Sequence, residues 1–315
     1  MTGSVCIVCG SKEMLPLYRT HDRHYGIAGD FDLVRCASCG LIRLDPMPTE
    51  KQLLTYYPEN YYAYLPQKQS IFWKQFLRHL LCLESKTHDP ELSGAGNFLD
   101  IGCGSGTYLK LMAERGWKVS GVEPSRHGAL AATSAGFDVF HGSLLDAGYP
   151  AASFDYVRSN HSFEHMPNPL EILQEIHRIL RPGGKLFIGI PNTDSFTFRL
   201  FGRYWWYLCA PVHTYNYSTK TITTLLHRTG FQIEKVFYNS DAWGLLGSLQ
   251  IFMNRNIGKK ADDGWLVHNQ FFRIFAHLAE KCIDRIHNGD KIEIISDKID
   301  GPTRECLLQE QPKSI

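Results

Sequence analysis

Apolar and polar positions alternate along the chain in two patterns. Short apolar runs bounded by turn residues predict buried strands, at 97–101, 118–122, 137–140, 154–158 and 185–190. Segments with apolar residues at helical spacing predict helices between these strands, at 108–115, 125–136 and 168–180. Strands that alternate with helices are typical of an α/β fold with a parallel sheet. Two later stretches, 231–238 and 291–296, can add a closing antiparallel pair.

The stretch from Asn97 to Glu123 carries the first candidate site. Its strand is followed directly by Gly102, Gly104 and Gly106. Three alternate glycines let the backbone turn sharply and open its N–H groups to a ligand. A helix and a second strand follow, and that strand ends on Glu123. Strand, glycine turn, helix, strand and terminal carboxylate together predict a nucleoside-binding βαβ unit.

Charge indicates which nucleoside suits this unit. Asp100 precedes the glycine turn and would repel a pyrophosphate at close range. Thr107 stands where a dinucleotide fingerprint has its last glycine. S-adenosylmethionine fits better, because it offers an ammonium group to Asp100, a carboxylate to the loop amides and ribose hydroxyls to Glu123. A glycine turn that binds no nucleotide is the alternative, and the two acids argue against it.

Two C-x-x-C pairs lie near the N-terminus, and a glycine follows each. Their cysteines are Cys6, Cys9, Cys36 and Cys39. Four thiolates satisfy tetrahedral zinc with no open position, so residues 1–48 are predicted to form a zinc ribbon with a structural ion. A redox pair is the alternative, but neither pair opens a helix of a thioredoxin-like unit. His21 and His24 could substitute as ligands and are expected to face solvent.

Composition narrows the class of protein. The 315 residues are 43% hydrophobic, and 33 basic residues balance 32 acidic ones, so no basic field is available for nucleic acid. Nine cysteines, an odd number, fit a reducing compartment, and we expect a cytoplasmic protein. No signal peptide and no apolar run long enough to span a bilayer are seen. The oligomeric state is left open.

The regions around the predicted core are rich in aromatic residues. An aromatic linker occupies 49–96, and its tyrosines are expected to pack between domains, with a place near a substrate mouth as the alternative. An amphipathic helix at 70–85 within it is expected to pack at the entrance of the core domain, 97–238. An insertion follows at 239–289, then a closing strand within 290–299 and a polar tail at 300–315. A stripe of apolar residues within 271–286 is expected to pack on its own domain. A dimer or membrane-surface contact of the helix at 269–287 is the alternative.

Polar residues follow the predicted strands at the edge where parallel sheets bind ligands. Asn160, His161 and His165 come after the strand at 154–158. Ser143 and Leu144 lie in a loop that could edge an adenine base. His213 lies near the end of a long aromatic segment, 191–217, of a length that usually binds or covers something.

Five motifs follow one another in this core: FLDIGCGSGTYL, GVEP, FDYVRSNHSFEHMPNP, ILRPGGKLFIGIPN and HTYNYSTKTITTLLHRTGFQIEKV. They resemble the motifs of class I S-adenosylmethionine-dependent methyltransferases. CASCGLIRLDPMPTE with YYPENYY is similar to the zinc-ribbon leader of a subgroup often associated with surface glycans, sugars or secondary metabolites, and GDKIEIISDK to its last strand. The resemblance implies a Rossmann-like seven-stranded sheet, mainly parallel with one antiparallel strand, flanked by helices.

The resemblance also implies roles for individual residues. Asp100 and the glycines would hold the methionine end of the donor, and Glu123 its ribose. Ser143 stands where many relatives have an acid, so the adenine contact is expected from the backbone and Leu144. His161 replaces what is often Asp or Asn and could bind the donor. His165 and His213 are candidates for the base, with a structural histidine as the alternative for each.

The expected reaction is methylation of an oxygen or carbon of a small-molecule acceptor that resembles a sugar, glycan or secondary metabolite. Two alternatives remain. One is an RNA-base methyltransferase that reads RNA with the ribbon, against which the charge balance argues. The other is a non-catalytic protein that binds the donor or uses the ribbon for interactions.

Overall fold

The computed structural model describes residues 5–57, 87–90, 96–255 and 264–299. The predicted helix at 70–85 and the predicted tail at 300–315 lie outside the described residues. The N-terminal part begins with β1 (Met14–His21), β2 (Asp30–Cys36), β3 (Ile42–Leu44) and α1 (Glu50–Thr55).

A seven-stranded sheet forms the centre of the molecule, in the order β10-β11-β8-β7-β4-β5-β6. Its strands are β4 (Asn97–Ile101), β5 (Lys118–Glu123), β6 (Asp138–His141), β7 (Phe154–Asn160), β8 (Leu180–Pro191), β10 (Phe231–Tyr238) and β11 (Lys291–Lys298). Only β11 runs antiparallel to its neighbours. The predicted seven-stranded sheet with one antiparallel strand is confirmed.

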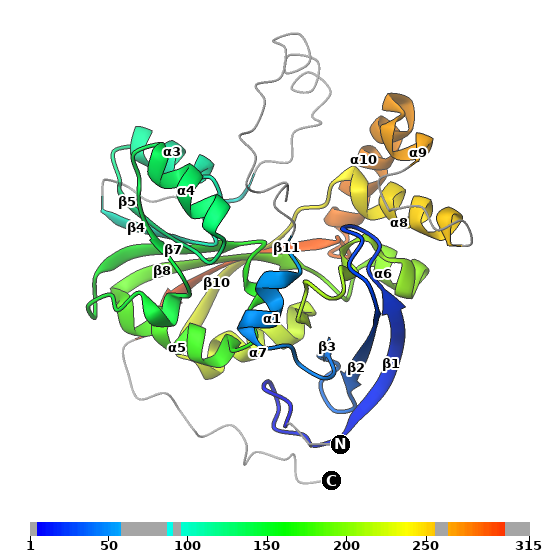
Figure 1. Ribbon diagram of the computed structural model, residues 1–315, viewed down its shortest axis with the longest axis horizontal. Coiled ribbons are helices and arrows are strands. Elements are labelled where there is room, and N and C mark those ends of the chain that lie inside the picture. The colour runs from blue at the N-terminus through cyan, green and yellow to red at the C-terminus, as the bar shows by residue number, and fades with distance from the viewer. Residues whose placement is uncertain (1–4, 58–86, 91–95, 256–263, 300–315) are drawn as a thin grey trace.

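Helices cover both faces of this sheet. α3 (Thr107–Glu114) and α4 (Arg126–Ser134) lie on one face, and α5 (Pro169–Ile179) and α7 (Thr219–Arg228) on the other (Figure 1). Successive side chains of a strand point to opposite faces. Leu99 of β4 therefore packs toward α5 and α7, while Phe98 packs toward α3, and both are fully buried. Burial on both faces explains why these strands read as continuous apolar runs.

The connection between α5 and β8 differs from the prediction. Because the predicted helix ends at residue 180 and the predicted strand begins at residue 185, residues 181–184 are expected to form a turn between them. Instead α5 ends at Ile179, and β8 begins at Leu180 and continues through these residues. Phe154 pairs with Leu180, and a register shift before Tyr156 absorbs the extra residues. The bulge accommodates Pro182 and the glycines inside a strand.

A second, four-stranded sheet has the order β1-β2-β3-β9. Its last strand, β9 (Tyr215–Asn216), belongs to the aromatic segment after β8, which also contains α6 (Phe196–Phe201). Tyr215 pairs with Arg43, and Asn216 with Ile42. The small N-terminal sheet is thus hydrogen-bonded to the segment that carries His213.

The insertion between β10 and β11 is helical, with α8 (Ala242–Asn254), α9 (Trp265–His268) and α10 (Gln270–Arg285). The expectation that its apolar stripe packs on its own domain is wrong. Phe271, Phe275 and Leu278 are 63%, 57% and 52% exposed. The buried face of α10 instead carries Ala276, His277, Glu280 and Asp284. Within the described residues, no helix is long and apolar enough to cross a membrane.

The exposed stripe generates the first prediction. Phe275→Gln should change the free energy of unfolding by no more than about 0.5 kcal/mol, because a surface side chain loses little packing. Leu225→Ala in α7 should cost about 2–5 kcal/mol, since Leu225 is fully buried. Equilibrium unfolding in urea measures both changes. Equal destabilisation by the two substitutions would contradict the exposed orientation of α10.

Candidate functional site

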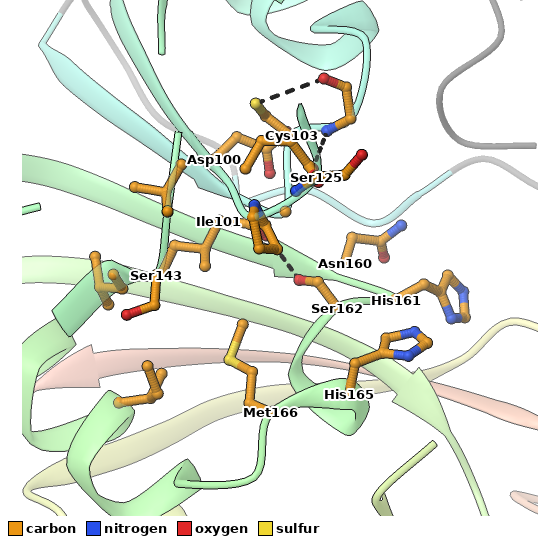
Figure 2. Close-up of a pocket in the computed structure, with 18 of the residues that line it drawn as sticks. Asp100, Ile101, Cys103, Ser125, Ser143, Asn160, His161, Ser162, His165 and Met166 are labelled. Atoms are coloured by element: carbon orange, nitrogen blue, oxygen red, sulfur yellow. Dashed lines mark hydrogen bonds between the residues drawn. The ribbon is translucent and has the colours of Figure 1, made fainter. Parts of the chain in front are cut away.

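A pocket of about 530 Å³ opens at the carboxyl ends of β4, β5 and β7. The strand order reverses between β4 and β7, which is where open parallel sheets bind ligands. Most of the residues predicted for the site line this pocket: Asp100, Gly102, Gly104, Glu123, Ser143, Leu144, Asn160, His161 and His165. Figure 2 shows Asp100 and Ser143 on one side of it and the two histidines on the other. Gly106 and His213 do not line it.

The glycine turn works through its backbone. Gly102, Gly104 and Gly106 have φ angles of +76°, +54° and +79°, which side chains rarely tolerate. A Cβ on Gly102 would lie 2.5 Å from the Cβ of Ser162. A Cβ on Gly106 would lie 2.9 Å from the ring of Phe137. Gly102 and Gly104 thus form the pocket wall, whereas Gly106 lets α3 begin close to α4.

A buried ion pair lies at the base of the turn. Nη1 of Arg158 in β7 donates to Oδ1 of Asp100 in β4 at 3.2 Å, and both side chains are less than a tenth exposed. The guanidinium also lies 3.6 Å from the ring centroid of Tyr108. Burial raises the pKa of Asp100, and Arg158 opposes that shift. Sequence reasoning missed Arg158, although a basic residue in a predicted buried strand was a visible signal.

Glu123 ends β5 and is only 5% exposed. Its Oε2 accepts from the amide of Gly104 at 2.8 Å and its Oε1 from that of Ser125 at 2.9 Å. Burial raises the pKa of Glu123 to about 7, although these two amides act to lower it. The carboxylate therefore ties the glycine turn to the start of α4 and still has lone pairs to offer a ligand.

The loop after β6 forms another wall of the pocket. Leu144 is buried, and the Ser143 hydroxyl donates to Oδ2 of Asp146 at 2.9 Å. Asp146 also lines the pocket. Asp146 thus places a carboxylate in this loop, although Ser143 stands where many relatives have an acid. Sequence reasoning missed Asp146.

A cluster of histidines surrounds a buried glutamate after β7. Glu164 is 1% exposed, and its Oε1 lies 3.4 Å from Nδ1 of His161. Burial raises the pKa of Glu164, but the His161 hydrogen bond and the nearby histidine charges lower it to about 2. His161 has a φ of +52°, a strained conformation of the kind that clusters at functional sites. Glu164 was also missed, because nothing in the sequence distinguishes it from an exposed acid.

His165 and His213 meet at this cluster, with ring centroids 4.7 Å apart. Nδ1 of His165 lies 2.9 Å from the Val212 carbonyl and 2.8 Å from the Tyr57 hydroxyl. Nδ1 of His213 lies 2.9 Å from the Tyr207 carbonyl. Burial lowers the pKa of both, that of His213 to about 3, so both imidazoles are neutral at pH 7. His165 faces the pocket, and His213 lies behind it.

The N-terminal cysteines form a separate cluster. Sγ of Cys6 lies 3.5 Å from that of Cys39, and the same distance separates Cys9 and Cys36. The two cysteine turns have the same backbone hydrogen bond: the amides of Cys6 and Cys36 each donate to the carbonyl five residues later at 2.8 Å. The following glycine has a positive φ in both turns. The four sulfurs are placed so that they could hold one metal ion.

Comparisons with known proteins bear on the core. A family model described as "Methyltransferase domain" matches residues 72–236. A "Probable S-adenosylmethionine-dependent methyltransferase" of Mycolicibacterium smegmatis is 29% identical over 166 residues, 52% of this chain and 60% of the relative. A "Ubiquinone biosynthesis O-methyltransferase" of Idiomarina loihiensis is 35% identical over 103 residues, 30% of this chain and 42% of the relative. The chain thus spans about half the length of these curated relatives.

Solved structures similar to this chain include an S-adenosylmethionine-dependent methyltransferase of Thermotoga maritima described as a "possible histamine N-methyltransferase". It is 21% identical, with a TM-score of 0.47, and the match covers 72% of this chain and 94% of that one. An S-adenosylmethionine-dependent methyltransferase of Mesorhizobium loti is 20% identical, with a TM-score of 0.46 and coverage of 67% and 94%.

The buried ion pair generates the second prediction. Arg158→Met should lower the free energy of unfolding by about 3–5 kcal/mol, because it leaves the Asp100 carboxylate buried without its partner. Urea unfolding measures the loss. The matched control is Arg181→Met, whose pair with Asp155 is 45% and 33% exposed and should contribute about 0–1 kcal/mol. The double variant Arg158→Met/Asp100→Asn should regain part of the loss. No recovery would indicate that Arg158 acts by packing or through Asp89, whose Oδ1 lies 3.9 Å from its Nε.

Proposed function

We propose, because the chain belongs to the methyltransferase-domain family, that it transfers a methyl group from S-adenosylmethionine to an oxygen or carbon of a small-molecule acceptor. One observation carries the proposal: the Asp100–Arg158 pair, the carboxylate of Glu123 and the imidazole of His165 all face one pocket. These groups match the two ends of the donor and the place where an acceptor must lie.

The donor matches the pocket part by part. Its ammonium group is complementary to Asp100, and its carboxylate to Arg158 and the amides of the glycine turn. Its ribose hydroxyls can donate to Glu123. Its adenine fits against Leu144, and Asp146 can accept from the exocyclic amino group. Asn160 and His161, beside the turn, complete the donor contacts in this proposal.

Methyl transfer is an in-line displacement. The acceptor atom forms a bond to the methyl carbon, the methyl–sulfur bond breaks, and its electron pair stays on sulfur. The protein mainly aligns the reacting atoms and excludes water. A hydroxyl acceptor must also lose its proton. His165, which faces the pocket as a neutral imidazole, takes that proton in our proposal, with His213 packed behind it.

The acceptor is proposed to be sugar-like or to resemble a secondary metabolite. The zinc-ribbon motif supports this class, because it resembles the leader of methyltransferases that act on such molecules. α1 adds Leu53, Leu54 and Tyr57 to the pocket, so an acceptor would meet both apolar surface and a hydroxyl. Transfer to oxygen also agrees with the activity named for the ubiquinone-pathway relatives.

The proposal includes a structural zinc ion on the four cysteines. Sulfurs at about 2.3 Å from a tetrahedral zinc lie about 3.8 Å apart, close to the 3.5 Å seen for two of the pairs. Four thiolates leave no open position, so this ion would stabilise the small sheet rather than take part in chemistry.

Donor binding provides the third prediction. Glu123→Gln should weaken binding of S-adenosylhomocysteine at least about tenfold, because an ionised acceptor is lost from the ribose. In the wild type, affinity should rise from pH 6 to pH 8. The pKa of Glu123 is raised to about 7, so below that pH binding must first release its proton. Isothermal titration across this range measures both effects.

Glu114→Gln is the control, because Glu114 is an exposed acid on α3. It should leave both the affinity and its pH profile unchanged. A Glu123→Gln variant that keeps the wild-type rise in affinity would contradict the role given to Glu123. Absence of binding to well-folded wild-type protein would overturn the proposed function itself.

The cysteine cluster provides the fourth prediction. Cys36→Ser should remove the zinc that survives dialysis against a chelator and lower the melting temperature, because three thiolates hold the ion less tightly. Elemental analysis and thermal unfolding measure the two effects. Cys282→Ser, at an exposed cysteine of α10, should change neither. Full zinc content in Cys36→Ser would exclude the cluster as its site.

A further inference from the structure

The geometry beneath the pocket points to a second metal site: Glu164, His165 and His213 bind a divalent transition-metal cation that activates the acceptor. One ligand atom from each of these residues lies within 4.8 Å of the others. Oε1 of Glu164 is 4.0 Å from Nε2 of His213. Ligand atoms at about 2.0–2.2 Å from a tetrahedral cation lie about 3.3–3.6 Å apart, so these side chains would have to draw closer together to share one ion. These residues come from two segments far apart in sequence.

The imidazoles are oriented as ligands. His165 and His213 each place Nδ1 at 2.9 Å from a backbone carbonyl, that of Val212 and that of Tyr207. A carbonyl can only accept, so the proton of neutral His213 lies on Nδ1 and its lone pair on Nε2, the nitrogen nearest Glu164. The Val212 carbonyl favours the same tautomer in His165, whose ring also contacts the Tyr57 hydroxyl and the backbone of His161. Metal-binding histidines are held in this way, with the second nitrogen bonded to a carbonyl or carboxylate.

The glutamate supplies the negative charge. Glu164 is 1% exposed, and its Oε2 has no hydrogen-bond partner among the described residues. Its ion-pair contacts within the same residues are with histidines alone. With His165 and His213 neutral, His161 at 3.4 Å is the side chain among the described residues that can compensate this buried carboxylate. A metal ion would add positive charge and supply the missing contact.

The ligand set favours a transition metal. Imidazole nitrogens suit zinc, iron, cobalt and nickel, whereas magnesium and calcium prefer oxygen ligands. Two histidines and one carboxylate hold the catalytic zinc of some hydrolases and the iron of some oxygenases, and both leave coordination positions open. Because His165 faces the pocket, an acceptor oxygen can reach such a position.

The role of the cation rests on the proposed function. A hydroxyl bound to a cation loses its proton more readily. The acceptor O–H bond breaks as its proton passes to solvent. The oxygen then bonds to the methyl carbon, and the methyl–sulfur bond breaks with its electron pair on sulfur. In the metal-loaded protein, His165 is therefore a ligand rather than the base.

Metal binding can be tested without knowing the acceptor. The full chain, with zinc on its cysteines, is treated with a chelator and titrated with Co²⁺. We expect one cobalt per chain, without the strong near-ultraviolet absorption of thiolate-bound cobalt. Glu164→Gln and His213→Asn should each weaken cobalt binding at least about tenfold, since a ligand is lost. Elemental analysis counts the cobalt and the zinc in the same sample.

His227→Ala is the matched control, because His227 is an exposed histidine on α7. It should bind cobalt like the wild type. Retention of one zinc and of binding to S-adenosylhomocysteine reports that each variant is folded. Wild-type protein that binds S-adenosylhomocysteine but no cobalt would overturn the metal site and leave the proposed function intact. Unchanged cobalt affinity in both cluster variants would overturn it as well. Cobalt binding without S-adenosylhomocysteine binding would support the site while the proposed function fails.

Discussion

Asp100 and Arg158 lie opposite each other in the register of β4 and β7, and their side chains form a buried, hydrogen-bonded ion pair between these strands. A slip of one residue would turn either side chain to the other face, so the pair fixes how these strands align. Both strands lead directly into the pocket, β4 into the glycine turn and β7 into His161. The alignment of these two strands therefore sets where the turn and the histidine cluster lie relative to each other.

The same constraint shapes the electrostatics of the pocket. An acid alone beside the turn would make that end negative and suited to a cation. The Asp100–Arg158 pair instead presents one negative and one positive charge to the pocket, a few ångströms apart. An amino acid carries both charges, so in the proposed function the pair would suit the methionine end of the donor more closely than a lone carboxylate. Tyr108, at the start of α3, packs against the guanidinium and restricts its orientation.

The small sheet and the histidine cluster are joined by hydrogen bonds along the chain. β3 begins shortly after the second cysteine turn and pairs with β9. Thr214 lies just before β9, and its backbone amide donates to the Glu164 carbonyl oxygen at 2.9 Å. The Thr214 hydroxyl donates to the same oxygen at 3.0 Å. His213 is thereby held beside His165. A metal ion on the cysteines would stabilise this arrangement from a distance, without any contact with the pocket.

The contrast between α3 and α10 explains how much the sequence could reveal. The βαβ unit was predictable because glycines, apolar runs and a terminal acid act over a few neighbouring residues. Arg158 and Glu164 were missed because their roles depend on contacts with residues from other segments of the chain. In α10 the rule that the apolar face of a helix is its buried face fails. Burial and Asp290 raise the pKa of Glu280, which favours its uncharged form. Asp284 accepts hydrogen bonds from the Ser240 amide and hydroxyl. Once these acids face inward, helical geometry directs Phe271 and Phe275 toward solvent.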